Sequence, residues 1–307
     1  MKRIFASFTA LVFLTSAAVA QVWINEVLTN PNGSDSTATS GNEYFELRGT
    51  PSLSLAGYYL LSIEGQGTAT GDVNQFFDLG SFVIGANGYL FARQFGSLYT
   101  TTAPGATVIE NTPGQGWGLT GASTVGHNGD GTQVDLENSA TTVMLINIGS
   151  GGAPTLALDL DADNDGLMEL PAGWAVADSV GIMDSANALA ADFSYGLITL
   201  RVGGLGTNVL GNVVDVPGTP PTTAGAMYVG RKGESTGSTA DDWFGAILNG
   251  SAADPLNIFF ASASDGDQVG KRLPDMNFGG TNPIPEPGIL ALLGLGCLGF
   301  LWRRRIR

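Results

Sequence analysis

The sequence predicts an all-β protein, and three observations support this prediction. Glycine accounts for 45 of the 307 residues, and charged residues make up only 13% of the chain. Short runs rich in β-branched and aromatic residues alternate with clusters of Gly, Asn, Asp, Ser and Pro. No long segment carries a convincing 3.6-residue apolar period, which would indicate an amphipathic helix. Many short strands separated by turn clusters are typical of a β-sandwich.

The expected strands follow one another along a β domain that we place at residues 21–262. GSGGAP at 149–154 marks a junction where two sub-lobes could meet, although each side has too few strand-like segments for an independent sandwich. Residues 263–283 are rich in Gly, Pro and Asp, so we expect a linker there. The main strand-like runs are VWINEVL (22–28), EYFELR (43–48), GYYLLSIE (57–64), FFDLGSFVIG (76–85), GYLFAR (88–93), TTVMLINIG (141–149) and MYVGR (227–231).

The charge of the chain limits its partners. Residues 21–283 contain 7 Lys or Arg and 27 Asp or Glu, a net charge of −20. Such a polyanion repels phosphate backbones, so we expect no nucleic-acid partner. It can recruit divalent cations and stay soluble outside a cell. The single cysteine, Cys297, excludes an intramolecular disulfide and a cysteine cluster for zinc.

The first 20 residues are typical of a signal peptide. A positive start at Lys2 and Arg3 precedes an apolar stretch, and Ala18 and Ala20 form the small-residue pattern of a cleavage site. We therefore expect signal peptidase to release a mature chain that begins at Gln21; an uncleaved membrane anchor, which needs a longer apolar stretch, is the alternative.

The last 24 residues have three parts: Pro285-Glu286-Pro287, an apolar run over 288–302, and a basic cluster at Arg303, Arg304 and Arg305. This pattern resembles the PEP-CTERM sorting signal. As a transmembrane helix the run would rise only about 22 Å, short for a hydrocarbon core of about 30 Å. The resemblance implies transient anchoring in the inner membrane, cleavage by an exosortase near Pro-Glu-Pro, and delivery to the cell surface or outside. A permanent anchor is the alternative.

The front of the β domain resembles a lamin-tail domain. The similarity lies in the segments 22–31, 42–47, 55–60 and 88–90, and more loosely in Arg231 and 240–244. It implies an expanded immunoglobulin-like β-sandwich with Gly/Asp-rich loops. Within it we expect Glu26 and Glu46 to accept hydrogen bonds that hold the fold, rather than to do chemistry.

One segment predicts a metal site. Asp161, Asp163 and Asp165 alternate before a glycine, as in the first half of an EF-hand loop, where carboxylates surround a Ca²⁺ ion. Leu167 would add its carbonyl and Glu169 a further carboxylate. The usual glutamate at position twelve is replaced by alanine, so Asp178, Asp184 or water would complete the site. A solvated acidic loop is the alternative, and the turn at 126–131 is a weaker second candidate.

We find no catalytic motif, so we do not expect an enzyme. His127 is the only histidine and lies in a glycine-rich turn, without the G-x-S-x-G elbow of a serine hydrolase. The chain is predicted to be a non-enzymatic surface or extracellular-matrix protein, associated with exopolysaccharide or biofilm. One alternative is a glycan-binding module that stacks sugars on Trp117, Trp174 or Trp243, of which Trp117 is expected to be the most exposed. A weaker alternative is a secreted hydrolase with paired carboxylates.

Overall fold

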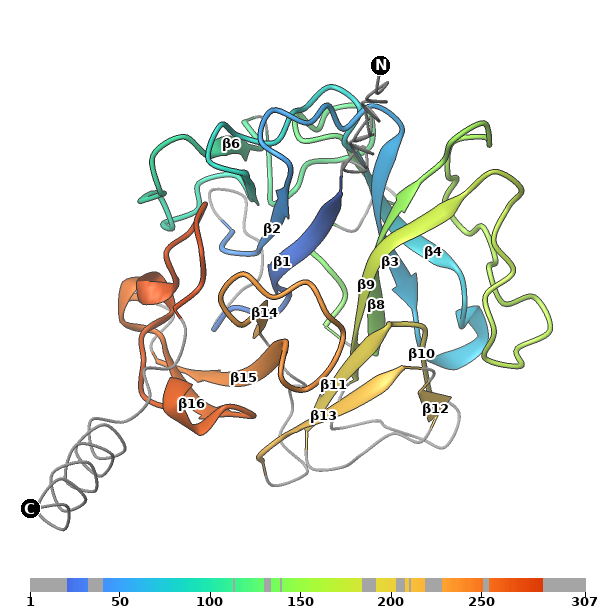
Figure 1. The fold of residues 1–307 in the computed structure, drawn as a ribbon. Helices are drawn as coiled ribbons and strands as arrows, with labels where there is room; N and C mark the ends of the chain where they lie inside the picture. Colours follow the sequence, from blue (N-terminus) through green and yellow to red (C-terminus); the bar gives the residue numbers. More distant parts are fainter. Residues whose placement is uncertain are drawn as a thin grey trace, which may run out of the picture.

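The computed structural model confirms that the protein is all-β. It describes residues 21–32, 41–112, 114–129, 134–138, 140–183, 192–202, 208–209, 211–218, 228–250 and 254–283. Among these residues the helical segments are short 3₁₀ turns: η1 (Gly67–Ala69), η2 (Pro255–Asn257), η3 (Gly266–Gln268) and η4 (Leu273–Met276). Strands carry the architecture (Figure 1).

The first sheet has seven strands and contains the first and the last strand of the described residues. Its central strands pair antiparallel: β1 (Val22–Leu28) lies between β14 (Tyr228–Arg231) and β2 (Tyr44–Gly49), and β2 also pairs with β5 (Tyr89–Arg93). Alternate residues of β2 point to opposite faces, so Phe45 and Leu47 enter one apolar cluster while Tyr44 enters another. In spatial order the strands are β16 (Phe259–Ala263), β15 (Trp243–Asn249), β14 (Tyr228–Arg231), β1 (Val22–Leu28), β2 (Tyr44–Gly49), β5 (Tyr89–Arg93) and β6 (Thr107–Glu110).

The second sheet also has seven strands and mixes two kinds of pairing. From β9 (Ala175–Met183) through β8 (Thr141–Asn147), β3 (Tyr58–Glu64) and β4 (Val73–Asp78) to β7 (His127–Asn128), neighbouring strands pair antiparallel. In contrast, β9 pairs in parallel with β11 (Ile198–Val202), and β11 with β13 (Asn212–Val216). A small parallel pair, β10 (Phe193–Ser194) with β12 (Asn208–Val209), accompanies them. In spatial order the strands are β13 (Asn212–Val216), β11 (Ile198–Val202), β9 (Ala175–Met183), β8 (Thr141–Asn147), β3 (Tyr58–Glu64), β4 (Val73–Asp78) and β7 (His127–Asn128).

The parallel part corrects the expected fold. An immunoglobulin-like sandwich is built from antiparallel strands, whereas parallel neighbours need crossover connections. Here β9, β11 and β13 lie side by side in sequence order, with the parallel pair β10 and β12 in the connections, as in successive coils. Strands β5 and β6 are a further parallel pair. The architecture reads as a β-solenoid rather than as the expanded sandwich that the sequence predicted.

One apolar cluster joins the two sheets. The first sheet contributes Ile24 and Leu47, and the second contributes Phe77, Val180 and Leu200, all fully buried. In Figure 1 the blue strand β1 lies beside the yellow-green strand β9. Burial of this apolar area is the main source of stability, at about 25 cal/mol per Å².

A second apolar cluster corrects the expected linker at 263–283. Leu273, Met276 and Phe278 are at most 3% exposed and pack with Tyr44 and Phe91, which project from the first sheet. The folded unit therefore continues beyond residue 262. Composition misled the prediction because three well-placed apolar side chains are enough to dock a Gly/Pro/Asp-rich segment.

The segment 149–154 is a turn within one unit. It follows β8, and β8 pairs directly with β9 in the second sheet. The Trp174 indole donates a hydrogen bond to the Gly152 carbonyl at 2.8 Å, and Gly151 N donates to the Ile148 carbonyl at 2.7 Å. The residues on either side of this turn share one sheet, so it does not separate two lobes.

A buried ion pair links the sheets. The Arg231 guanidinium of β14 lies 2.6 Å from the Asp178 carboxylate of β9, and the two side chains are 0% and 2% exposed. The same carboxylate oxygen accepts the Ile24 backbone N–H at 2.9 Å, while Arg231 Nε donates to the Ile24 carbonyl at 2.8 Å. The guanidinium also stacks on the Trp243 ring, 4.3 Å from its centroid. Burial raises the pKa of Asp178, and Arg231 opposes that rise.

We expect Arg231→Met to reduce the free energy of unfolding by about 3–5 kcal/mol, because it leaves the Asp178 charge buried without its partner. Urea denaturation of the processed protein measures this loss. Arg272→Met is the matched control: it breaks an exposed Arg272–Asp275 pair and should leave stability close to that of the parent. Equal losses in the two variants would contradict the role of Arg231.

Candidate functional site

The acidic loop lies between β8 and β9 and packs on the turn that joins β3 to β4. Leu160 is fully buried, and its backbone N–H donates to the Gly71 carbonyl at 3.0 Å. Glu169 N donates to the Leu160 carbonyl at 2.7 Å, which closes the loop at its base. The loop is therefore held at a defined place against the second sheet.

Asp161 organises the turn. Its carboxylate is fully buried and accepts hydrogen bonds from the backbone N–H groups of Asp165 and Gly166, at 3.0 Å each. The Tyr195 hydroxyl, from beyond β10, donates to the same carboxylate at 2.6 Å. Gly166 has a φ of +87°, and a Cβ there would lie 2.8 Å from the Phe193 ring, so the position requires glycine.

The structure brings four predicted metal ligands together. Asp161, Asp163, Asp165 and Glu169 each offer a carboxylate oxygen, and these oxygens lie within 4.8 Å of one another. Asp161 is buried and the other three are exposed. Oxygen ligands at this spacing suit Ca²⁺, which takes six to eight of them. Because Asp161 also anchors the turn, it is partly occupied by hydrogen bonds.

The remaining candidate ligands lie in different places. Leu167 has an exposed side chain at the rim of the loop, and its backbone N–H donates to Asp165 Oδ1 at 2.8 Å. Asp178 belongs to the buried ion pair with Arg231 and so is not a ligand of the loop. Asp184 lies outside the described residues. If the loop binds a cation, further coordination would fall to the Leu167 carbonyl and to water.

Negative charge accumulates beside the loop. Asp72, at the end of the neighbouring turn, forms a β-bridge with Asp159. Burial raises the pKa of Asp72, and the Asp159 charge raises it further. A cation bound to the loop would relieve this repulsion between carboxylates.

Glu26 and Glu46 form a second carboxylate cluster, inside the protein. They are directly opposite on β1 and β2 and are fully buried. The Tyr44 hydroxyl donates to Glu26 at 2.8 Å, while Asn25 Nδ2 and the Gly279 N–H donate to Glu46. These contacts agree with the expectation that both residues hold the fold.

Burial raises the pKa values of both glutamates. It raises the pKa of Glu26 to about 8, against the opposing effect of the Tyr44 and Tyr228 hydroxyls. Burial and the neighbouring Glu26 raise the pKa of Glu46 as well. The cluster therefore holds a proton at neutral pH, because two buried carboxylates this close cannot both ionise cheaply.

The tryptophans expected to bind sugars lie in the protein interior. Trp117 and Trp243 are 0% exposed and Trp174 is 9% exposed. The Trp117 indole donates to the buried Glu43 carboxylate at 2.7 Å and stacks on Phe45. The expectation that Trp117 is exposed is wrong: its flanking glycines provide tight turns around a core ring.

His127 is also a core residue. Its ring nitrogens lie 2.7 Å from the Gly118 carbonyl and 3.0 Å from Gln75 Oε1. Burial lowers the pKa of His127 to about 4, so the ring is neutral at pH 7. A neutral ring donates from only one of these nitrogens. At 1% exposure the ring lies in the core, away from the surface.

Sequence reasoning missed two partners at these sites. Tyr195 lies 34 residues from Asp161, and Asp178 lies 53 residues from Arg231. Neither pairing leaves a local signal, because sheet topology alone brings the residues together.

The targeting segments lie mostly beyond the described part of the chain. Ala18, Ala20, Pro285-Glu286-Pro287 and Arg303, Arg304 and Arg305 fall outside the described residues, whereas Gln21 is the first described residue. Within the described ranges, no helix is both long and apolar enough to cross a membrane.

Comparison with known proteins supports the C-terminal assignment. The PEP-CTERM protein-sorting motif matches residues 283–305. This motif implies an exported protein that is anchored in a membrane and then processed by an exosortase. No curated protein and no solved structure matches the chain. The lamin-tail resemblance is not matched by a family and stays a hypothesis.

The raised pKa of Glu26 predicts a pH dependence of stability. Between pH 4.5 and about 8 the folded protein retains a proton that the unfolded chain releases, so stability is greatest at the acid end and falls as pH rises. The slope should approach 1.4 kcal/mol per pH unit for one such group.

Glu26→Gln mimics the protonated form and should remove the contribution of Glu26 to this slope, while that of Glu46 remains. Urea denaturation at several pH values between 5 and 8 tests this, with the exposed Glu234→Gln as control. Parallel profiles for the parent and Glu26→Gln would show that Glu26 does not hold the proton.

Proposed function

We propose that this chain is a non-enzymatic protein of the cell surface or extracellular matrix, released from the inner membrane by an exosortase. The observation that carries the proposal is the sorting motif at 283–305. The β domain ahead of the motif would act as a stable structural module. The front segments of this domain are the ones that resemble a lamin-tail domain. Its only histidine, His127, is 1% exposed, and this burial favours a structural role over hydrolysis.

Processing tests this proposal directly. In cells that contain an exosortase, the full chain should yield a soluble form that begins at Gln21 and ends near Pro285–Pro287. Mass spectrometry of the released protein gives both ends. In matched cells without the exosortase the chain should remain in the membrane fraction; release there with the same C-terminus would contradict the proposal.

We further propose that Ca²⁺ stiffens the module at the acidic loop. The support is the convergence of Asp161, Asp163, Asp165 and Glu169, whose carboxylate oxygens lie within 4.8 Å of one another. Four negative charges at this spacing repel one another in the absence of a cation. Binding to the folded state alone would then raise stability by mass action.

Calcium at about one hundred times its dissociation constant should stabilise the processed protein by about 2.7 kcal/mol. For a domain of this size that corresponds to a rise in melting temperature of about 5 °C or more. Asp163→Ala should abolish the rise, whereas Asp267→Ala, an exposed aspartate outside the loop, should retain it. Identical melting in calcium and in chelator would remove the metal from the proposal and leave the sorting intact.

Glycan binding, the alternative matrix role, loses the support of Trp117, Trp174 and Trp243. Their rings are enclosed in the core and present no face to a sugar. A glycan-binding role would need other aromatic residues, so we do not favour it.

A further inference from the structure

The chain is fixed to the domain immediately before the sorting motif. Residues 278–282, here called the strap, lie across the outer face of the first sheet. The Phe278 carbonyl accepts Ala103 N at 2.7 Å, and the Gly279 carbonyl accepts Asn87 Nδ2 at 2.7 Å. Thr281 Oγ1 lies 3.0 Å from the Tyr89 hydroxyl, and Asn282 Nδ2 donates to the Arg231 carbonyl at 2.9 Å.

The strap leaves little chain between the folded domain and the membrane. Only residues 283–287 separate Asn282 from Gly288, where the apolar run begins. A chain extends by at most about 3.6 Å per residue, so this stretch reaches about 20 Å. A domain of about 260 residues has a radius of gyration of about 18 Å. The face that carries the strap must therefore be turned toward the membrane before cleavage.

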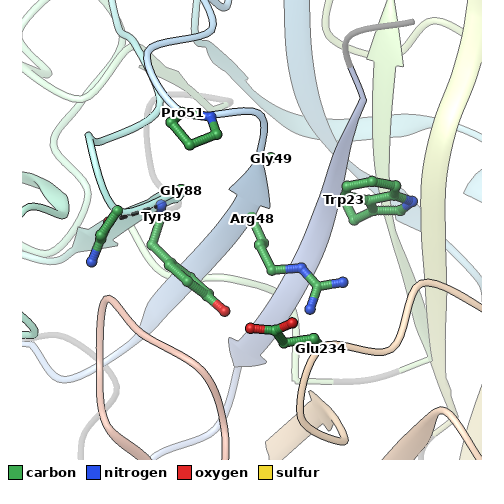
Figure 2. A pocket seen from close by; sticks show the side chains of 8 residues that line it. Trp23, Arg48, Gly49, Pro51, Gly88, Tyr89 and Glu234 are labelled. Atoms are coloured by element: carbon green, nitrogen blue, oxygen red, sulfur yellow. Dashed lines mark hydrogen bonds between the residues drawn. The ribbon is translucent and has the colours of Figure 1, made fainter. Parts of the chain in front are cut away.

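This face contains a pocket beside the strap. Figure 2 shows Trp23, Arg48, Tyr89 and Glu234 around it, and its volume is about 230 Å³. Trp23, Arg48 and Tyr89 are neighbours in the register of β1, β2 and β5, on the outer side of the first sheet. Tyr89 holds the strap through Thr281, so the pocket and the strap share one support.

The pocket carries groups that suit a protein partner. Arg48 is 8% exposed, lies 5.5 Å from the centre of the Trp23 ring, and donates to the carbonyls of Gly233 and Ser235. Among the described residues no carboxylate lies within ion-pair distance of Arg48. Glu234 adds an exposed negative charge at the rim. Trp, Tyr and Arg in a recess are the residue types that dominate protein interfaces.

We propose that this face, defined by Trp23, Arg48, Pro51, Tyr89 and Glu234, contacts the exosortase when the enzyme cleaves the tail. The inference rests on the proposed function. The short reach places Pro285-Glu286-Pro287 within a few residues of the strap, so an enzyme bound at this motif meets the folded domain. The exosortase would thus recognise a surface of the domain in addition to the sorting motif.

The test follows cleavage of the full chain in cells that contain the exosortase, with mass spectrometry of the released C-terminus over time. Glu234→Arg, which reverses an exposed charge on this face, should slow processing at least threefold. Asp78→Arg is the matched control, because Asp78 is exposed and lies on β4 of the second sheet, facing away from the strap. Melting of each released protein checks that the domain remains folded.

A second variant tests whether the effect of Glu234→Arg depends on the short chain between the domain and the membrane. A ten-residue Gly/Ser insertion between Pro283 and Ile284 extends the reach to about 54 Å. In this background the chain with Glu234→Arg and the chain with Glu234 should be processed at the same rate.

A smaller effect of Glu234→Arg than of Asp78→Arg at native spacing would overturn the inference. Faster processing of Glu234→Arg would overturn it too, since that result indicates contact with anionic lipid headgroups. Failure of the parent chain to be cleaved would instead refute the proposed function.

Discussion

One buried ion pair fixes how the two sheets meet. Arg231 and Asp178 join β14 to β9, and both also bond to the backbone of Ile24 on β1. A charge pair without water is stable only when its remaining donors and acceptors are satisfied. The Gly237 carbonyl, 2.6 Å from Arg231 Nη1, and the Trp243 ring complete this requirement. The pair thus fixes the position of one sheet on the other more specifically than apolar packing does.

Sequence periodicity located many of the strands but not their connections. Runs such as 22–28 and 141–147 alternate or are continuously apolar, and both become strands. The parallel ladder β9, β11 and β13 was missed, because short runs at 198–202 and 212–216 say nothing of which strand each one pairs with. Composition indicates a linker at 263–283. Leu273 and Met276 are nevertheless buried in the second apolar cluster, so this segment belongs to the folded unit.

Local sites were easier to predict than distant ones. The carboxylates of Asp161–Glu169 lie within nine residues, so a single turn is enough to bring them together. The buried carboxylates behave differently. Glu26 and Glu46 meet through strand register, and their polarity predicts exposure rather than complete burial. The burial of Trp117 could not be predicted either. Its glycine neighbours indicate a surface turn, whereas the hydrogen bond to Glu43 holds its indole in the core.

The buried glutamates also connect the fold to the exit of the chain. Glu46 accepts the Gly279 N–H, and Asn282 donates to the Arg231 carbonyl, so the strap bonds to both groups that stabilise the first sheet. A misfolded sheet would lose these acceptors and release the strap. The distance between the sorting motif and the folded surface therefore depends on correct folding. The strap ends at residue 282, immediately before the matched motif, so removal of the tail leaves these bonds in place. The domain then keeps its second apolar cluster after it leaves the membrane.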